Sequence, residues 1–157
     1  MANDLQIVGF SVGKEHFGVP ISSVHEIVRA MEVTAVPDSP SYVEGVINLR
    51  GKIIPVIDLR KRFGEKSIAP HKKNRIVIAE VGGRMVGLMV DSASEVLRIP
   101  AGDVEPPPDV FSEGELNYVN GMAKTNNRLI ILIDLARIMQ AGELRRLGDL
   151  ANSAGAA

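Results

Sequence analysis

Short stretches of alternating hydrophobic and polar residues run through most of this chain, and turn-forming residues separate them. Alternation over a few residues predicts a strand with one buried face, whereas an unbroken apolar run between turns predicts a strand buried on both faces. The run 129–133 is of the second kind, which is typical of a small closed barrel. The stretches that predict strands are 5–12, 16–19, 46–50, 53–57, 76–81, 85–90, 118–125 and 129–133.

Apolar residues at helical spacing are found in fewer places. The clearest case predicts a helix with one apolar face, made by Ile21, Val24, Ile27, Val28 and Met31. The stretch 92–99 is shorter and fits either a strand or a helix. Two further short helices are predicted at 58–63 and 135–140.

The chain contains an internal repeat. A shift of 69 positions aligns 7–29 with 76–98, where 8 of 23 pairs are identical, and a shift of 76 aligns 42–64 with 118–140, where 7 of 23 match. Average composition would give roughly 3 identities in all these pairs together. Turn residues recur as well, since Arg50-Gly51 aligns with Asn126-Asn127, and such residues accept the positive φ of tight hairpins. We therefore interpret 7–64 and 76–140 as two copies of one unit.

A unit of this size would be marginally stable alone, so we expect the two copies to share a core. The prediction is a single domain over 1–150, mainly β, made of two intertwined small barrels packed together. The second copy has seven extra residues between Arg98 and Tyr118, where Pro106 to Pro108 mark a longer connecting loop. The tail 151–157 has no large side chain to bury and is expected to be disordered.

Composition narrows the class of function. A net charge of -1 with 45% hydrophobic and 24% charged residues is ordinary for a globular protein. The absence of cysteine excludes a disulfide scaffold, a thiol nucleophile and any cysteine-ligated metal. The charge balance and an aromatic content of 4% argue against nucleic-acid binding. No apolar run approaches the ~18 residues of a membrane span and no secretory signal is visible, so we expect a cytoplasmic protein.

Motifs that could carry catalysis are weak. Residues 9–13 fit the G-x-S-x-G pattern around Ser11, but that motif needs a helix after its sharp turn, and a second strand is predicted here. Residues 45–52 resemble a phosphate loop with the wrong spacing and with Ile53 where Ser or Thr is required, so Gly51 more simply closes a hairpin. The three histidines, His16, His25 and His71, have no metal-ligand spacing. We expect no enzymatic activity, cofactor or metal.

Four charged residues have positions that suggest a structural role, three at the ends of predicted elements and Glu26 within the predicted helix. Asp58 and Asp134 fall between a strand and a helix, where a carboxylate caps the first amides of the helix. Pro55 lacks a donor, which predicts a bulge or an open edge in its strand. Glu26 and Arg50 could pair and fix the predicted helix against the barrel, or could be independent solvated charges.

Three segments resemble the CheW family of bacterial chemotaxis coupling proteins. They are 17–29, 86–91 and, most specifically, 45–60, with its Asn48-Leu49-Arg50-Gly51 hairpin followed by an apolar strand and Asp58. The likeness runs in order over about residues 5–145, and the chain departs from the pattern from Ile138-Met139 onward.

The resemblance implies a non-enzymatic adaptor made of two SH3-like five-stranded β-barrels. Its partners would be the cytoplasmic hairpin tip of a chemoreceptor and the regulatory domain of the histidine kinase CheA, so that it reaches membrane arrays only through receptors. The receptor tip would lie in a groove between the barrels, and the kinase would meet exposed apolar residues at the barrel ends. By matching position, the receptor-binding residues are Val24, Glu26, Ile27, Arg50, Gly51 and Val96.

Two other functions remain open from the sequence. A coupling protein of a related twitching or surface-sensing system would have the same architecture. A small serine hydrolase using Ser11 and a histidine is the more distant alternative.

Overall fold

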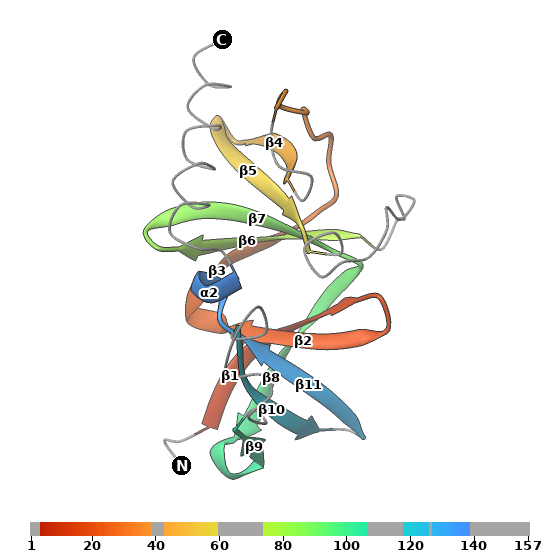
Figure 1. Ribbon diagram of the computed structural model, residues 1–157, viewed down its shortest axis with the longest axis vertical. Coiled ribbons are helices and arrows are strands. Elements are labelled where there is room, and N and C mark those ends of the chain that lie inside the picture. The colour runs from red at the N-terminus through yellow and green to blue at the C-terminus, as the bar shows by residue number, and fades with distance from the viewer. Residues whose placement is uncertain (1–3, 39–42, 60–73, 107–117, 126, 139–157) are drawn as a thin grey trace.

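The computed structural model describes residues 4–38, 43–59, 74–106, 118–125 and 127–138. They form almost entirely β-structure (Figure 1). The first copy contributes β1 (Asp4–Val12), β2 (Glu15–Pro20), the 3₁₀ turn η1 (Ile21–Ser23), β3 (Val24–Arg29), β4 (Val43–Leu49) and β5 (Lys52–Asp58). The second copy contributes β6 (Arg75–Val81), β7 (Arg84–Val90), β8 (Ser92–Pro100), η2 (Ala101–Asp103), β9 (Val104–Glu105), β10 (Val119–Thr125), β11 (Arg128–Ile133) and the helix α2 (Leu135–Ile138).

Each of the two sheets is built from both sequence copies. One sheet has the order β8-β1-β2-β11-β10-β9, and the other has the order β3-β6-β7-β5-β4. The first copy's β1–β2 hairpin therefore lies among strands of the second copy, and the β6–β7 hairpin lies among strands of the first. Parallel pairings join the copies, with Phe17 opposite Ile131 and Leu88 opposite Ile57. The two copies are intertwined, and each sheet needs strands from both.

Each sheet curls until its two ends meet in one bent segment. In the first sheet the end strands β8 and β9 are consecutive and are joined by η2. In the second, the chain beyond β3 returns to β4, where Thr34 and Val46 exchange two backbone hydrogen bonds of 2.9 Å. With β8 and β9 counted as one bent strand, the molecule consists of two five-stranded barrels. The predicted fold class is confirmed.

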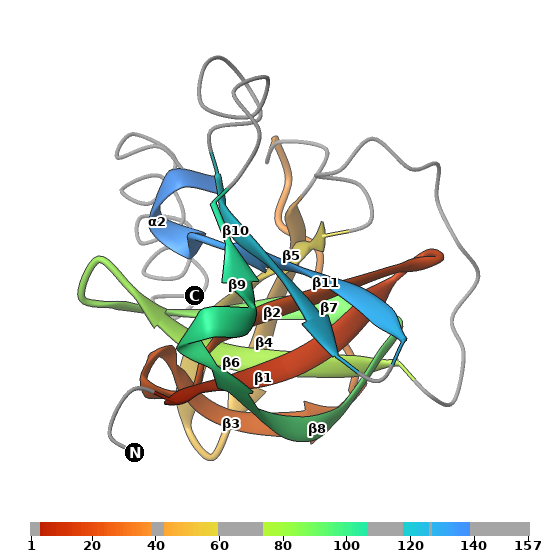
Figure 2. The same cartoon turned by 90° about the horizontal axis from the view of Figure 1, so that it is seen from below.

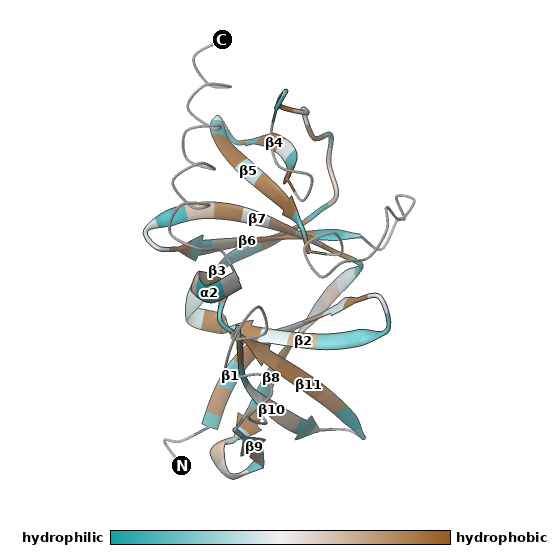
Figure 3. Ribbon diagram, viewed as in Figure 1, coloured by the Kyte–Doolittle hydropathy of each residue, from teal (hydrophilic) through white to brown (hydrophobic). Residues whose placement is uncertain are grey.

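The hydrophobic core has three parts. The largest lies between the sheets and contains alternate residues of β1, β2, β6 and β7, such as Val8, Val19, Val77 and Leu88. The other residues of the same strands fill the barrels, with Ile7 in the first and Ile76 in the second. Figure 3 shows hydrophobic residues along β5 and β11 and hydrophilic residues at hairpin ends. Burial on both faces explains the apolar runs, and the predicted shared core is confirmed.

Two equivalent glycines make room for the barrel cores. Gly18 and Gly87 occupy the same place in the two copies, and each faces the equivalent isoleucine, Ile7 or Ile76. A Cβ atom at Gly87 would lie 2.9 Å from Cγ2 of Ile76 and 3.3 Å from Cγ2 of Val56. Both neighbours are β-branched and stiff, so they yield only by a change of packing.

Gly87→Ala is therefore expected to lower the free energy of unfolding by about 1–3 kcal/mol through overpacking. Urea unfolding followed by circular dichroism measures the change. Gly102→Ala is the matched control, because a Cβ there meets nothing within 4 Å, and we expect less than about 0.5 kcal/mol. Equal stability of the two variants would contradict this account of the barrel interior.

The long helix predicted around Ile21 to Met31 is wrong. The structure has the 3₁₀ turn Ile21–Ser23 and then strand β3, whose exposure alternates between half-buried and exposed residues. Val24, Ile27 and Val28 fit both periodicities in so short a window, and β-branched residues favour the strand. Antiparallel pairing with β6 decides the outcome, with Ile27 opposite Val77.

The other local predictions have mixed outcomes. The ambiguous stretch 92–99 is a strand, β8. Asp134 caps α2, since its Oδ1 accepts hydrogen bonds from the N–H groups of Ala136 at 2.9 Å and Arg137 at 3.3 Å. Strand β5 pairs with β7 only from Val56 onward, so that edge of β5 is open at Pro55 as expected. Most of the helix predicted over 58–63 lies outside the described residues, which stop at Leu59 in this part of the chain. Pro107, Pro108, His71 and the tail 151–157 also lie outside them.

Candidate functional site

The hairpin between β4 and β5 presents the first part of the candidate site. Leu49 and Lys52 are paired, and the two residues between them, Arg50 and Gly51, have φ values of 50° and 88°. Two positive φ values in a two-residue loop are the mark of a type I′ turn, whose twist matches that of the strands. Asn48 supports the turn, because its Oδ1 accepts a hydrogen bond of 2.9 Å from the Gly51 N–H. The prediction that Gly51 closes a hairpin is confirmed.

Glu26 and Arg50 form an ion pair. The Arg50 guanidinium donates from Nη2 to Oε1 of Glu26, which extends from β3. The two residues belong to opposite ends of their sheet, since β3 and β4 are its edge strands. The pair therefore crosses the seam where the barrel closes. The alternative of two independent charges is excluded, although the partner of Arg50 is on a strand and not on a helix.

The ion pair is too exposed to hold the fold together. The side chain of Arg50 is 69% exposed and that of Glu26 is 27% exposed. Pairs in such surroundings contribute about 0–1 kcal/mol, because water screens the attraction and two long side chains lose freedom. A Cβ on Gly51 would meet nothing within 4 Å, so the space beside the turn is open. The turn presents the Arg50 guanidinium largely to solvent, with Glu26 as its ion-pair partner.

Two exposed apolar side chains occupy equivalent positions in the two copies. Ile27 on β3 is 36% exposed and Val96 on β8 is 61% exposed, and a shift of 69 positions aligns them. Both β3 and β8 are edge strands of their sheets. Figure 2 shows them along the same side of the molecule. A surface with an apolar residue from each barrel is thereby formed by the repeat itself.

The structure unites some of the sequence-predicted site residues and separates others. Glu26, Arg50 and Gly51 lie together at the seam. Val24 packs partly against the shared core, and the register shift between Val24 and Glu26 places these two side chains on opposite faces of β3. Ile27 lies on the same face as Val24, opposite Val77 of the shared core. Val96 lies on the other barrel. The six residues therefore form a seam cluster of three residues and three apolar positions on β3 and β8, and the hollows found among the described residues do not bring all six together.

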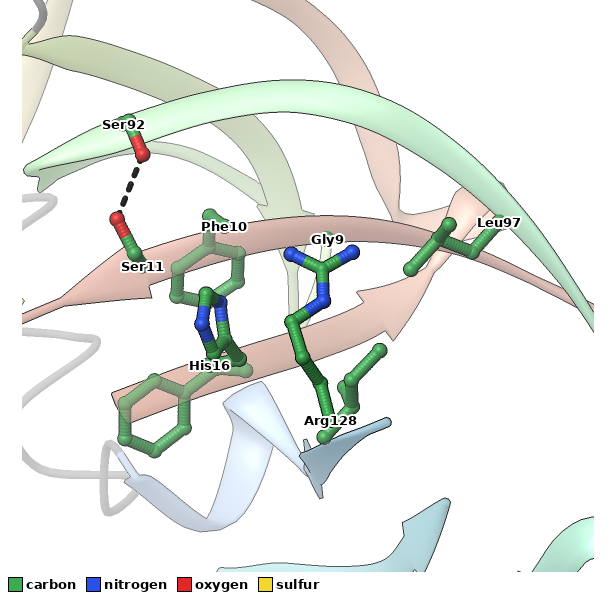
Figure 4. A pocket seen from close by; sticks show the side chains of 9 residues that line it. Gly9, Phe10, Ser11, His16, Ser92, Leu97 and Arg128 are labelled. Atoms are coloured by element: carbon green, nitrogen blue, oxygen red, sulfur yellow. Dashed lines mark hydrogen bonds between the residues drawn. The ribbon is translucent and has the colours of Figure 1, made fainter. Parts of the chain in front are cut away.

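Ser11 lies in a different place, at the mouth of the first barrel (Figure 4). A hollow of about 70 Å³ is lined there by Gly9, Phe10, Ser11, His16, Phe17, Ser92, Leu97, Arg128 and Ile130. His16 stands opposite Ser11 across the β1–β2 pair, yet the Ser11 hydroxyl is hydrogen-bonded to the hydroxyl of Ser92 at 2.6 Å. Among the described side chains that line the hollow there is no carboxylate to orient a histidine, which a catalytic triad requires. The arrangement gives no support to a serine hydrolase.

Two further properties concern the described part of the chain. Within it, no three His, Asp or Glu side chains gather in a way that could hold a metal ion. None of its helices has the length and apolar character needed to cross a membrane.

Comparison with known proteins identifies the family of this chain. The model of the CheW-like domain matches residues 6–143. The chain belongs to the CheW-like domain family. A chemotaxis protein CheW of Rhizobium meliloti is 36% identical over 138 residues, 88% of this chain and 89% of that protein. A probable chemotaxis protein CheW of Rhizobium etli is 37% identical over 140 residues, 89% of this chain and 90% of that protein.

A solved structure agrees with the sequence relatives. The scaffolding protein TtCheW from Thermoanaerobacter tengcongensis superposes with a TM-score of 0.80 and 42% identity, over 89% of this chain and 95% of that one. The family and fold expected from the CheW-like motifs are confirmed. So is the general function, a scaffold of bacterial chemotaxis.

Proposed function

We propose that this CheW-like chain binds chemoreceptors and the histidine kinase CheA at the same time and catalyses no reaction itself. It would be a cytoplasmic protein that reaches the membrane array through the receptors. Support comes from the scaffold and chemotaxis names of its relatives and from the surface chemistry. The observation that carries the proposal is the pair of exposed apolar residues, Ile27 and Val96, at equivalent edge strands of the two barrels.

The receptor's helical hairpin tip is the proposed occupant of this face. An amphipathic helix binds by laying its apolar residues against an apolar surface, with charged residues at the rim fixing its register. Ile27 and Val96 provide the apolar part, and Val24 lies beside them on β3. Arg50 and Glu26 provide charge at the seam, and Gly51 leaves the approach to Arg50 open.

The backbone at Arg50 supports a functional role for its side chain. A left-handed φ costs a residue with a Cβ roughly 1–2 kcal/mol, and Asn tolerates it better than most. The second copy has Asn126 at the equivalent position. Arg50 adopts a left-handed φ that asparagine would adopt at lower cost, and its side chain is 69% exposed. Such a residue contributes little to stability, so its side chain is better explained by contact with a partner.

The kinase CheA would bind through its regulatory domain, which the family resemblance implies is itself CheW-like. The resemblance implies that the kinase meets exposed apolar residues at the barrel ends, and Leu129, near the β10–β11 turn, is 48% exposed. A second surface, away from β3, would leave the receptor face free.

Binding of a receptor hairpin-tip fragment to the purified protein tests the receptor contact, by titration calorimetry at physiological salt. We expect Ile27→Ser with Val96→Ser to weaken binding at least tenfold, because the apolar contact is lost from both barrels. Leu129→Ser is the control of equal chemistry outside the receptor face and should leave receptor affinity unchanged. Wild-type affinity in the double variant would refute the proposed face.

A further inference from the structure

One exposed apolar side chain belongs to neither the receptor face nor the kinase surface. Ile21, the first residue of η1, is 37% exposed. Its equivalent in the second copy, Val90, is fully buried at the end of β7, where it pairs with Arg75. The two differ because β2 ends at Pro20 and the chain then bends into η1, whereas β7 continues through the equivalent position. The exposure of Ile21 is therefore a feature of the first copy alone.

Ile21 lines a hollow of about 460 Å³ at the ends of three strands. The start of β1 lies beside the end of β2, with Ile7 opposite Pro20, and beside the end of β8, with Gln6 opposite Arg98. Figure 2 shows the start of β1 next to the bend between β2 and β3. The volume lies within the roughly 300–1,000 Å³ of clefts that bind ligands. The lining residues are Asp4, Leu5, Gln6, Pro20, Ile21, Ser22 and Arg98.

Arg98 provides the positive charge of this hollow. Its side chain is exposed, and within the described part of the chain it has no ion-pair partner, although Asp4 lines the same hollow. A guanidinium presents N–H donors in a planar fork that matches a carboxylate. An unpaired guanidinium beside the apolar Ile21 suits a partner that offers a carboxylate next to an apolar side chain.

The hollow continues into the receptor face at both of its borders. Along β8, Val96 and Arg98 are two residues apart, so their side chains lie on the same face of the sheet. Two strand residues span about 7 Å, little more than the 5.4 Å of one helical turn. At the other border, η1 leads directly into β3, where Val24 packs partly against the shared core. A helix that lies over Val96 therefore reaches the hollow with about one further turn.

We propose that this hollow receives an acidic side chain of the receptor hairpin tip, which pairs with Arg98 while a neighbouring apolar residue packs on Ile21. The inference rests on the proposed receptor contact and adds a residue that determines specificity. Receptors with a carboxylate about one helical turn beyond the apolar contact would bind well. Receptors with a neutral or basic residue there would bind more weakly.

Calorimetry with the receptor hairpin-tip fragment tests the contribution of Arg98. Arg98→Gln should weaken binding about three- to tenfold, because a charge-assisted contact is lost, and should reduce the salt dependence of the affinity. Lys14→Gln is the matched control, since it removes an exposed positive charge at the other end of the β1–β2 hairpin, and it should leave the affinity unchanged. Ile21→Ser should weaken binding severalfold.

A double-mutant cycle identifies the partner's charge. Each acidic residue of the fragment is replaced in turn by its amide, and one replacement should weaken binding to the wild type but not to Arg98→Gln. Asp4→Asn should bind at least as tightly as the wild type, because it removes a negative charge beside the incoming carboxylate.

Three results would overturn the proposal: wild-type affinity in Arg98→Gln, no fragment position coupled to Arg98, or weaker binding by Asp4→Asn, which would indicate a basic side chain in the hollow. If Ile27→Ser with Val96→Ser still weakens binding in those cases, the receptor face stands and only the role of the hollow is wrong. No binding of the fragment to the wild type would refute both.

Discussion

Gly45→Ala is expected to lower the free energy of unfolding by about 2–6 kcal/mol, a large part of what a domain of this size usually has. Gly45 has a φ of 146°, a conformation that only glycine adopts readily, and it lies against the backbone of the segment that closes the second barrel. An added Cβ would lie 2.7 Å from the carbonyl carbon of Thr34 and 3.0 Å from Cα of Ala35. These neighbours are backbone atoms, which cannot move aside by a rotamer change as the end of a flexible side chain can. Strain and overpacking of about 1–3 kcal/mol each would remove much of the 5–15 kcal/mol that a domain usually has.

The matched control is Gly51→Ala in the hairpin that follows. Gly51 also has a positive φ, 88°, but a Cβ there meets nothing within 4 Å. We expect a loss of only about 1–2 kcal/mol from backbone strain. Urea unfolding of both variants measures the difference, and a loss at Gly45 no larger than that at Gly51 would show that the Thr34–Val46 closure is not the constraint.

Arg50→Glu is expected to reduce receptor binding at least tenfold while the protein stays folded. The change places a carboxylate opposite Glu26 and removes the guanidinium offered at the seam. Because Arg50 is 69% exposed, the loss of unfolding free energy should remain below about 1 kcal/mol. Calorimetry with the receptor fragment and urea unfolding together measure the two effects. Lys52→Glu makes the same charge change two residues away and should have a much smaller effect on binding.

The reversed pair separates two roles of Arg50. In Glu26→Arg with Arg50→Glu, an ion pair can form again across the seam. If Arg50 acts only by holding β3 and the hairpin together, binding should return. We expect it to remain weak, because the partner would contact the guanidinium at the turn itself. Full recovery would reassign Arg50 from partner contact to positioning of the hairpin.

The strands and their repeat could be predicted from sequence because both depend on local patterns. Two-sided burial leaves an apolar run such as 129–133, and turn residues recur at equivalent places. The exchange of hairpins between copies could not be predicted in detail. Val8 and Val77 face the same shared core whichever copy supplies the neighbouring strands, so exchanged and unexchanged barrels give the same pattern.

The error at β3 has a related cause. Six residues with Val24, Ile27 and Val28 fit a helix and a strand almost equally, and only pairing with β6, distant in sequence, distinguishes them. The site was predicted in part for the same reason. The Arg50-Gly51 turn is a local motif and was found. The pairing of Glu26 with Arg50 was only one of two alternatives, because it depends on barrel closure, which the sequence does not show.

The central claim is that one chain holds a receptor and a kinase at once. Sedimentation velocity of the receptor hairpin-tip fragment and the CheA regulatory domain, with and without this protein, tests it most directly. We predict a species containing all three components that forms only when the protein is present and that Arg50→Glu reduces to the protein–kinase pair. Binding of the receptor and the kinase in competition with each other, or of neither, would contradict the account.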